Sequence, residues 1–116
     1  RTSDNVYAMI APAIEGQFGD VTVPQLKEAI KALGFKDCLE VALGADVVAW
    51  REAEEVVANI KDGKKTTTSC CPAFVNLIEK HFPQLKENIS TTVSPMVATA
   101  RLIKASNPDA MYCKEK

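Results

Sequence analysis

The sequence predicts a three-layer α/β domain in which a small parallel β-sheet of about three strands lies between flanking helices. Short apolar runs alternate along the chain with longer segments whose apolar residues recur at helical spacing. Strands that alternate with helices favour parallel pairing through crossover connections. The 116 residues contain no internal repeat or low-complexity tract, so residues 1–116 are expected to form a single domain.

Three short segments are expected to supply the strands. Residues 6–11 form an unbroken apolar run, as a strand buried on both faces does. Residues 38–43 predict a second strand, which ends in a turn at residues 44–46. The threonines at 66–68 are β-prone and predict the third strand.

Four helices are expected to flank the sheet. The first begins at a capping box, Thr22 with Gln25, and ends at Gly34. The second covers residues 47–60. Its apolar stripe, expected to be its buried face, consists of Ala49, Ala53, Val56, Val57 and Ile60. The third and fourth are expected to begin at Pro72 and at Ser94-Pro95.

The charge balance argues against two classes of partner. The chain has 14 Lys and Arg against 15 Asp and Glu, a net charge of -1, so it offers no basic surface for nucleic acid or anionic lipid. Every apolar stretch is interrupted well before the ~18 residues that a membrane helix needs, so no membrane insertion is expected. No signal peptide is recognisable, which favours a cytoplasmic protein.

The four cysteines lie at positions 38, 70, 71 and 113, a spacing unlike an extracellular disulfide framework. Cys70 and Cys71 are neighbours, and Cα atoms ~3.8 Å apart lie closer than the ~4.4 Å at which ordinary disulfides begin. Their thiols are expected to serve metal, redox or proton chemistry in a reducing compartment. Cys38 lies inside a strand pattern and is interpreted as a small core residue.

The cysteine pair directly precedes the helix expected at Pro72. Unsatisfied N–H groups and the positive end of the helix dipole favour a thiolate there, the form that binds iron or zinc. Two adjacent cysteines could also be small core hydrophobes. The polar residues before them, Thr-Thr-Thr-Ser at 66–69, place the pair on a strand-to-helix loop, which favours a functional role.

Two carboxylates lie on a half-buried edge of the second helix. Glu52 and Glu55 are neighbours at i,i+3 spacing beside the apolar stripe. By pattern alone they belong to a solvated charged face together with Arg51 and Lys61.

Several segments together match a known family. Thr68-Ser69-Cys70-Cys71-Pro72-Ala73-Phe74, followed by residues 78–83 and Ser94-Pro95-Met96, resembles the first signature motif of the iron-iron (FeFe) hydrogenase catalytic domain. Residues 11–13, 32–35 and 44–46 are similar to the family's Ala-Pro-Ser, Leu-Gly-Phe and Gly-Ala-Asp segments, so the resemblance covers nearly the whole chain.

The resemblance implies a role for each matching residue. Cys71 corresponds to a thiolate ligand of the 4Fe-4S cubane of the H-cluster, which joins the cubane to a diiron subcluster. Cys70 corresponds to the thiol that exchanges a proton with the diiron site. The family's onward relay corresponds to Glu52, Ser90 and Glu55, and Pro12 and Ala13 correspond to residues near the diiron ligands.

The resemblance also implies a larger protein. The chain corresponds to the first lobe of the catalytic domain, and the second and third cysteine motifs are expected beyond Lys116. One thiolate cannot hold a cubane that takes about four cysteines, so the isolated lobe is expected to bind no cluster and to be inactive. The remainder of the domain and a ferredoxin or similar electron carrier are the implied partners. Cys113 matches the second motif only faintly and is interpreted as a coincidence.

Three departures from the family pattern leave an alternative open. Ala13 stands where serine is usual, Ala73-Phe74 replaces Gly-Trp, and Met96 replaces glutamine, which points to a slow or sensory member. The alternative is a non-catalytic hydrogenase-like iron-sulfur protein with a sensory or cluster-assembly role. Assembly relatives typically lack the first paired cysteine, so Cys70 favours catalysis. A thiol-redox or zinc module would need a C-x-x-C spacing, which the sequence lacks.

Overall fold

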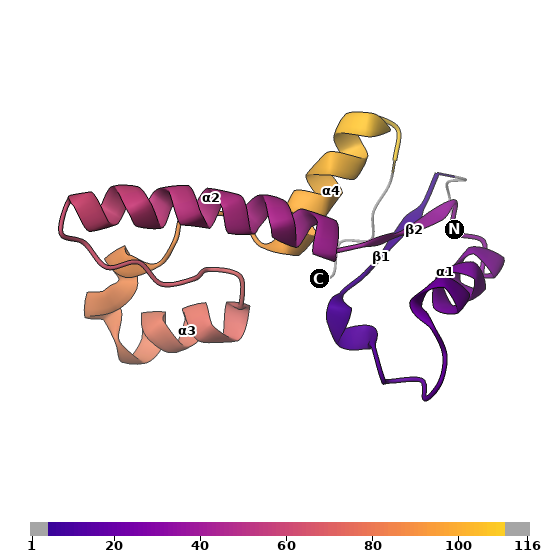
Figure 1. Cartoon of the computed structure of the whole chain (residues 1–116), viewed down its shortest axis with the longest axis horizontal. Helices are drawn as coiled ribbons and strands as arrows, with labels where there is room; N and C mark the ends of the chain where they lie inside the picture. Colours follow the sequence, from indigo (N-terminus) through magenta and orange to yellow (C-terminus); the bar gives the residue numbers. More distant parts are fainter. Residues whose placement is uncertain (1–4, 111–116) are drawn as a thin grey trace.

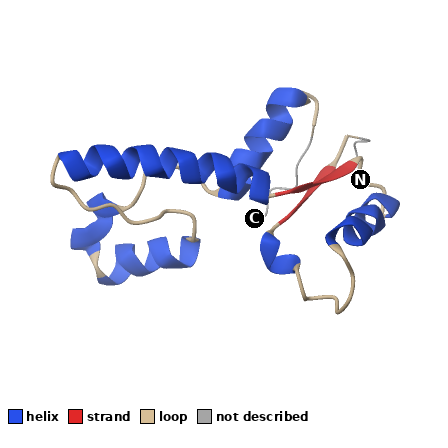
Figure 2. Cartoon of the chain, in the orientation of Figure 1, coloured by secondary structure: helices blue, strands red, loops and turns tan. Residues whose placement is uncertain are grey.

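The computed structural model describes residues 5–110 and contains a small parallel sheet among helices (Figure 1, Figure 2). The elements in chain order are β1 (Tyr7–Ile10), the 3-10 helix η1 (Pro12–Ile14), α1 (Val23–Ala32), β2 (Asp37–Glu40), α2 (Ala42–Lys61), α3 (Pro72–His81), the 3-10 helix η2 (Pro83–Asn88) and α4 (Pro95–Ser106). In Figure 1, α1 and α4 lie on either side of the two strands. The predicted α/β class is confirmed.

β1 and β2 pair in parallel, as the alternation of strands and helices predicts. Tyr7 lies opposite Asp37 and Ile10 opposite Glu40. The pairing continues one residue beyond β2, where the Val41 N–H donates to the Ile10 carbonyl oxygen at 2.8 Å. Since both strands point the same way, their carboxyl ends lie at one edge of the sheet, and η1 and α2 leave from that edge.

The third strand expected at residues 66–68 is a wrong prediction, because the sheet described within residues 5–110 consists of β1 and β2. Thr67 instead makes an isolated parallel bridge with Ile89. The reason is the length of α2: its 20 residues, at a rise of about 1.5 Å each, carry the chain roughly 30 Å from the sheet before residues 66–68 are reached.

α1 begins at the predicted capping box. The Gln25 N–H donates to Thr22 Oγ1 at 3.4 Å, and the Thr22 N–H donates to Gln25 Oε1 at 2.9 Å. Gly34, just after the helix, has a φ of 91°, a left-handed conformation that glycine adopts without steric cost. The first predicted helix is therefore confirmed together with its two end signals.

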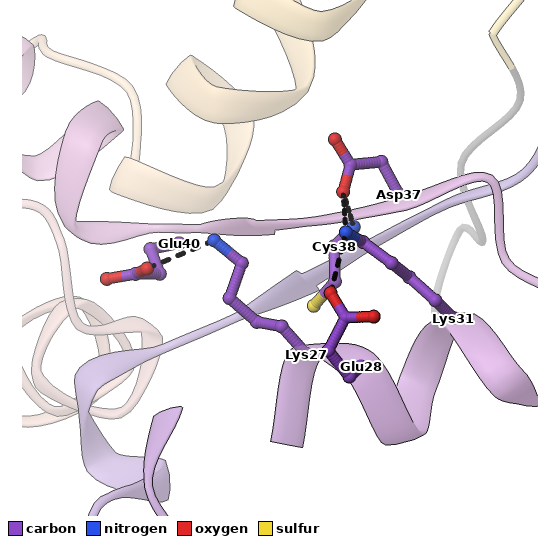
Figure 3. A network of polar contacts seen from close by, with 6 residues as sticks. All are labelled: Lys27, Glu28, Lys31, Asp37, Cys38 and Glu40. Atoms are coloured by element: carbon purple, nitrogen blue, oxygen red, sulfur yellow. Dashed lines mark hydrogen bonds and ion pairs between the residues drawn. The ribbon is translucent and has the colours of Figure 1, made fainter. Parts of the chain in front are cut away.

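Ion pairs fasten α1 to β2 (Figure 3). Lys27 Nζ lies 3.2 Å from Glu40 Oε1, and Lys31 Nζ lies 3.5 Å from Asp37 Oδ1. Cys38 lies between these charges with a side chain that is buried, and burial raises the pKa of its thiol. Cys38 is thus a neutral core residue, as the sequence predicts.

α2 begins earlier than the sequence suggests. The strand expected over residues 38–43 ends at Glu40, and the Ala45 N–H donates to the Val41 carbonyl oxygen at 2.9 Å. Residues 44–46 therefore lie within the helix, and the predicted turn there is wrong.

Gly44 marks the place where α2 crosses α4. A Cβ atom at Gly44 would collide with Thr99 Oγ1 and would lie 2.5 Å from the Pro95 carbonyl oxygen. Thr99 is 1% exposed, and its Oγ1 donates to that same carbonyl oxygen at 2.9 Å. A glycine that suggests a chain reversal in the sequence is needed here for close helix packing.

The covered face of α2 is not the predicted apolar stripe. Val57 and Ile60 are 54% and 66% exposed, and Trp50 is 70% exposed. The less exposed face of the helix carries Glu52 and Glu55. The radius of gyration of 17.1 Å also exceeds the about 13 Å typical of a compact domain near this size, in keeping with uncovered apolar surface.

The last two helices begin where the sequence predicts. Pro72 is the first residue of α3, with Cys71 at its N-cap. Ser94 is the N-cap of α4, and its Oγ accepts the Val97 N–H at 3.4 Å. Small and branched residues of α4, namely Ala98, Ala100 and Ile103, are buried.

The crossing at Gly44 gives a stability test. Replacing Gly44 with alanine forces the Cβ into Thr99, so we expect the free energy of unfolding to fall by about 1–3 kcal/mol despite alanine's higher helix propensity. Asp46→Ala, at an exposed position in the same turn, is the control and should change it by less than about 0.5 kcal/mol. Thermal or denaturant unfolding measures both, and an unchanged Gly44→Ala protein would contradict the close crossing.

Candidate functional site

The adjacent cysteines lie on the loop between the Thr67 bridge and α3. Both are exposed. Cys71 is the N-cap of α3, and its carbonyl oxygen accepts the Val75 N–H at 3.0 Å. The pair thus occupies the strand-to-helix position expected of functional cysteines, and the interpretation as core hydrophobes is wrong.

Glu52 of α2 binds this cysteine loop from the side. Its Oε1 accepts the Ser69 N–H at 3.3 Å and the Thr68 hydroxyl at 3.2 Å. The same oxygen accepts the Thr92 hydroxyl at 3.1 Å, from the segment that precedes α4. One carboxylate oxygen therefore holds together three parts of the chain that are far apart in sequence.

Thr68 joins Glu52 to Cys70. Thr68 Oγ1 lies 3.3 Å from Cys70 Sγ and also accepts the Cys70 N–H at 3.3 Å. The resemblance implies that Cys70 and Glu52 are successive members of a proton relay, and in the described structure the Thr68 hydroxyl lies between them. The Thr68 side chain can accept a proton from one neighbour while it donates its own to the other.

Glu55 lies one turn further along α2 and binds the chain around Ser90. The Ser90 hydroxyl donates to Glu55 Oε2 at 2.6 Å, and the Thr91 N–H and hydroxyl donate to Oε1 at 3.0 and 3.1 Å. The Ser90 hydrogen bond, followed by those from Thr91, holds the pKa of Glu55 below its ordinary value. Ser90 itself is only 5% exposed, which protects this bond from water.

Thr92 connects the two halves of the site. Its Oγ1 lies 2.8 Å from Ser90 Oγ and 3.1 Å from Glu52 Oε1. Hydrogen-bond contacts thereby run without a break from a thiol to a carboxylate. We call the residues along them the relay line: Cys70, Thr68, Glu52, Thr92, Ser90 and Glu55.

The structure therefore brings together four residues singled out from the sequence and adds two threonines. Glu52, Glu55, Ser90 and Cys70 all belong to the relay line. Thr68 and Thr92 were missed, because a threonine beside a cysteine or a serine carries no distinctive pattern. Their only signal was position, since each lies two residues from a predicted site residue.

The outer end of the relay line opens to a cavity of about 540 Å³. Glu55, Thr91 and Thr92 form part of its wall, together with Arg51 and Arg101. Arg51 is paired with Glu54, at 3.1 Å, and makes no ion pair with Glu55 among the described residues. The Glu55 carboxylate is therefore reachable by water from this side.

Pro12 and Ala13 lie in η1, directly after β1, and both are exposed. Figure 1 shows η1 and the N-terminal end of α3 on the same side of α2 in that view. No hydrogen bond or ion pair described in residues 5–110 joins Pro12 or Ala13 to the cysteine pair. The geometry thus places these two residues at the sheet edge, apart from the relay line.

Cys71 is suited to one position in a larger ligand set. Cys71 is the N-cap of α3, a helix of 10 residues, and its exposed thiol makes no capping hydrogen bond. In the part of the chain that the structure describes, no group of three or more His, Cys, Asp or Glu comes together as a metal site. An exposed cysteine at a helix N-cap can ligate iron as a thiolate. Cys113 lies outside the described residues.

Comparison with known proteins identifies the class. The family described as "Iron only hydrogenase large subunit, C-terminal domain" matches residues 4–116. The chain belongs to this family, and its resemblance to FeFe hydrogenases is confirmed.

The relatives are considerably longer than this chain. The chain is 32% identical to the periplasmic [Fe] hydrogenase large subunit of Nitratidesulfovibrio vulgaris, over 90% of the chain and 28% of that protein. It is 25% identical to the solved [FeFe]-hydrogenase HydA(deltaEFG), with a TM-score of 0.79, over 93% of the chain and 32% of that structure. The chain therefore spans about a third or less of the proteins it matches.

A further structural neighbour bears on the glutamates. The [FeFe]-hydrogenase HydA1 of Chlamydomonas reinhardtii is 26% identical, with a TM-score of 0.77, over 87% of the chain and 28% of that structure. It has been solved in variants altered at either of two glutamates three residues apart, the spacing of Glu52 and Glu55.

No helix of the described chain has the length and apolar character needed to cross a bilayer.

The hydrogen bonds of Glu55 predict a pH-dependent contribution to stability. Since the folded-state pKa lies below the ordinary value of 4.5, the contribution is complete above about pH 4.5 and is lost as the pH falls through the lowered pKa. Glu55→Gln should therefore lower the free energy of unfolding by about 1 kcal/mol at neutral pH.

This difference between wild type and Glu55→Gln should shrink as the solution is acidified below pH 4.5, which denaturant titrations over a pH series measure. Glu54→Gln is the matched control, because its exposed ion pair with Arg51 contributes little. A Glu55→Gln deficit that persists unchanged at low pH would contradict the assignment.

Proposed function

We propose that the full-length protein containing this chain interconverts H2 with protons and electrons at an H-cluster. The observation that carries the proposal is the unbroken relay line from Cys70 Sγ to Glu55 Oε2. Chemistry on hydrogen at iron needs protons delivered separately from electrons, and a line of acids and hydroxyls at hydrogen-bond spacing serves that purpose. Membership of the iron-only hydrogenase family supplies the reaction class.

Within this proposal, Cys70 is the inner end of the proton route. Its exposed thiol can give a proton to the diiron side and regain one through Thr68 from Glu52. Glu55 is the outer end, where the cavity admits water. Ser90 lies between the carboxylates and can donate and accept at once.

Cys71 is proposed as one thiolate ligand of the 4Fe-4S cubane. When bound, the H-cluster would supply electron storage at the cubane and hydrogen binding at the diiron subcluster. Pro12 and Ala13 are proposed to pack beside the diiron ligands, for which their exposure on η1 leaves room. A cubane takes about four cysteines, so we propose that the other ligands come from further segments and that this lobe alone is inactive and binds no cluster.

Partners and compartment follow the same proposal. The remainder of the catalytic domain would cover the exposed apolar face of α2 at Trp50, Val57 and Ile60. A ferredoxin or similar carrier would deliver electrons. The cytoplasm is the proposed compartment, because four cysteines without a disulfide-type spacing suit a reducing environment, although the N. vulgaris relative is named periplasmic.

Replacing Cys70 tests the proton role. In the full-length protein with its cluster assembled, Cys70→Ala should reduce hydrogen turnover by at least about 100-fold, because the inner proton donor is lost. Iron content and cluster absorbance should stay at the wild-type level. Cys38→Ala, in the core, is the cysteine control. The folded protein, separated from any misfolded protein before the assay, should retain wild-type turnover.

The outcomes separate the two functions considered. Normal turnover of Cys70→Ala would refute its proton role. A wild-type protein that assembles its iron-sulfur cluster and shows no hydrogen turnover would instead refute the proposed catalysis and favour the non-catalytic sensory or cluster-assembly alternative.

Replacing Cys71 tests the ligand role. Cys71→Ala should lose the cubane absorbance and about four irons per protein, because the cubane would lose one of its roughly four thiolate ligands. Its folding should be near normal, since the thiol is exposed and makes no capping bond. A variant with an unchanged iron content and spectrum would show that Cys71 is not a ligand.

A further inference from the structure

We propose that the Thr92 hydroxyl is itself a proton-carrying member of the relay line, an inference that rests on the proposed function. Within residues 5–110 no hydrogen bond joins Ser90 directly to Glu52. Thr92 Oγ1 lies between them, 2.8 Å from Ser90 Oγ and 3.1 Å from Glu52 Oε1. A proton that travels between the two carboxylates through the described side chains therefore passes through this hydroxyl.

The number of hydrogens between the carboxylates supports this role. Three contacts link them: Glu55 to Ser90, Ser90 to Thr92, and Thr92 to Glu52. Serine and threonine hydroxyls carry one hydrogen each, so two of the three contacts can hold a hydrogen when both carboxylates are ionised. One additional proton on either carboxyl group completes all three contacts, and the segment is thus built to accept a single proton.

The transfer consists of three linked proton transfers. With the added proton on Glu55 Oε2, that O–H bond breaks as a new one forms at Ser90 Oγ. The original Ser90 hydrogen passes to Thr92 Oγ1, and the original Thr92 hydrogen passes to Glu52 Oε1. One proton moves from Glu55 to Glu52, both hydroxyls end neutral, and no electron is transferred; the reverse order carries a proton outward.

The surrounding bonds hold Thr92 in the required position. Its backbone N–H donates to Ser90 Oγ at 3.1 Å, and its carbonyl oxygen accepts the Ser69 hydroxyl at 2.7 Å. The Ser90 N–H donates to the Thr67 carbonyl oxygen at 2.8 Å, so the segment is also joined to the cysteine loop. Thr92 is half-buried, which limits replacement of its hydroxyl by loosely held water.

The charged groups near this segment do not offer a second route through the described side chains. Arg51, Glu54 and Arg101 face the cavity beside Glu55, and the first two pair with each other at 3.1 Å. Arginine stays protonated at any pH of interest and does not pass a proton on. The Thr91 hydroxyl donates a hydrogen bond to Glu55, but no described hydrogen bond connects Thr91 with Glu52.

The test compares Thr92→Val with Thr92→Ser in the cluster-loaded full-length protein. Valine keeps the shape and removes the hydroxyl, so we expect turnover at least about tenfold lower, an unchanged KM for hydrogen, and a larger solvent deuterium isotope effect. Serine restores the hydroxyl and should recover turnover to within about twofold of wild type. Thr66→Val, at a threonine bonded to Asn59 outside the relay line, is the matched control.

A second measurement does not need a working cluster. In the full-length protein without its cluster, ¹³C NMR titration of the glutamate carboxyl groups reports how far Glu55→Gln shifts the titration of Glu52. That shift should be clearly smaller in the Thr92→Val background than in the Thr92→Ser background, because valine breaks the hydroxyl connection. Equal coupling in the two backgrounds would show that the Thr92 hydroxyl does not connect the two carboxyl groups, while the isotope effect reports the proton transfer itself.

The results separate this inference from the proposed function. If Cys70→Ala abolishes turnover while Thr92→Val retains it with an unchanged isotope effect, the Thr92 inference is overturned and the proposed function stands. If Cys70→Ala is fully active, the proton role of Cys70 fails while hydrogen turnover by the protein stands. If the cluster-loaded wild type shows no hydrogen turnover, the proposed function fails, whatever the carboxyl coupling in the Thr92 variants. Equal carboxyl coupling in the valine and serine backgrounds would also overturn the inference.

Discussion

The site depends on one carboxylate oxygen. Glu52 Oε1 accepts hydrogen bonds from Thr68, Ser69 and Thr92, and so ties the cysteine loop and the segment before α4 to the middle of α2. Without those bonds the relay line from Cys70 would be interrupted at Glu52, and the cysteine loop would remain joined to Ser90 and Thr92 through the Thr67 carbonyl oxygen and the Ser69 hydroxyl. A half-buried carboxylate with several donors is a strong anchor, because leaving those donors unsatisfied would be costly.

The rest of the fold makes this anchor possible. The parallel pair β1 and β2 starts α2 at the sheet edge, and the close crossing at Gly44 fixes its direction against α4. A helix of 20 residues then carries Glu52 and Glu55 away from the sheet along one face. The polar face of α2 is thus turned inward to the site, and its apolar face is left exposed for the remainder of the domain that we propose.

Local signals in the sequence predicted the helix starts at Thr22, Pro72 and Ser94, because caps and prolines act within a few residues. They failed at Gly44 and at residues 66–68, where long-range geometry decides: a close helix crossing in the first case and the length of α2 in the second. The cysteine pair could be predicted from its place before a helix, whereas Glu52, Ser90 and Glu55 came from family resemblance, since by pattern alone the glutamates belong to a solvated face. Thr68 and Thr92 could be found only once the hydrogen bonds were seen.

The most direct test of the relay line is a neutron crystal structure of the full-length protein with its cluster bound. We expect Cys71 on the cubane, and deuterium between Ser90 Oγ and Thr92 Oγ1 and between Thr92 Oγ1 and Glu52 Oε1 whenever one carboxyl group is protonated. A structure in which Glu52 points away from the cysteine loop, with no side-chain or ordered connection to Thr68 and Thr92, would contradict it.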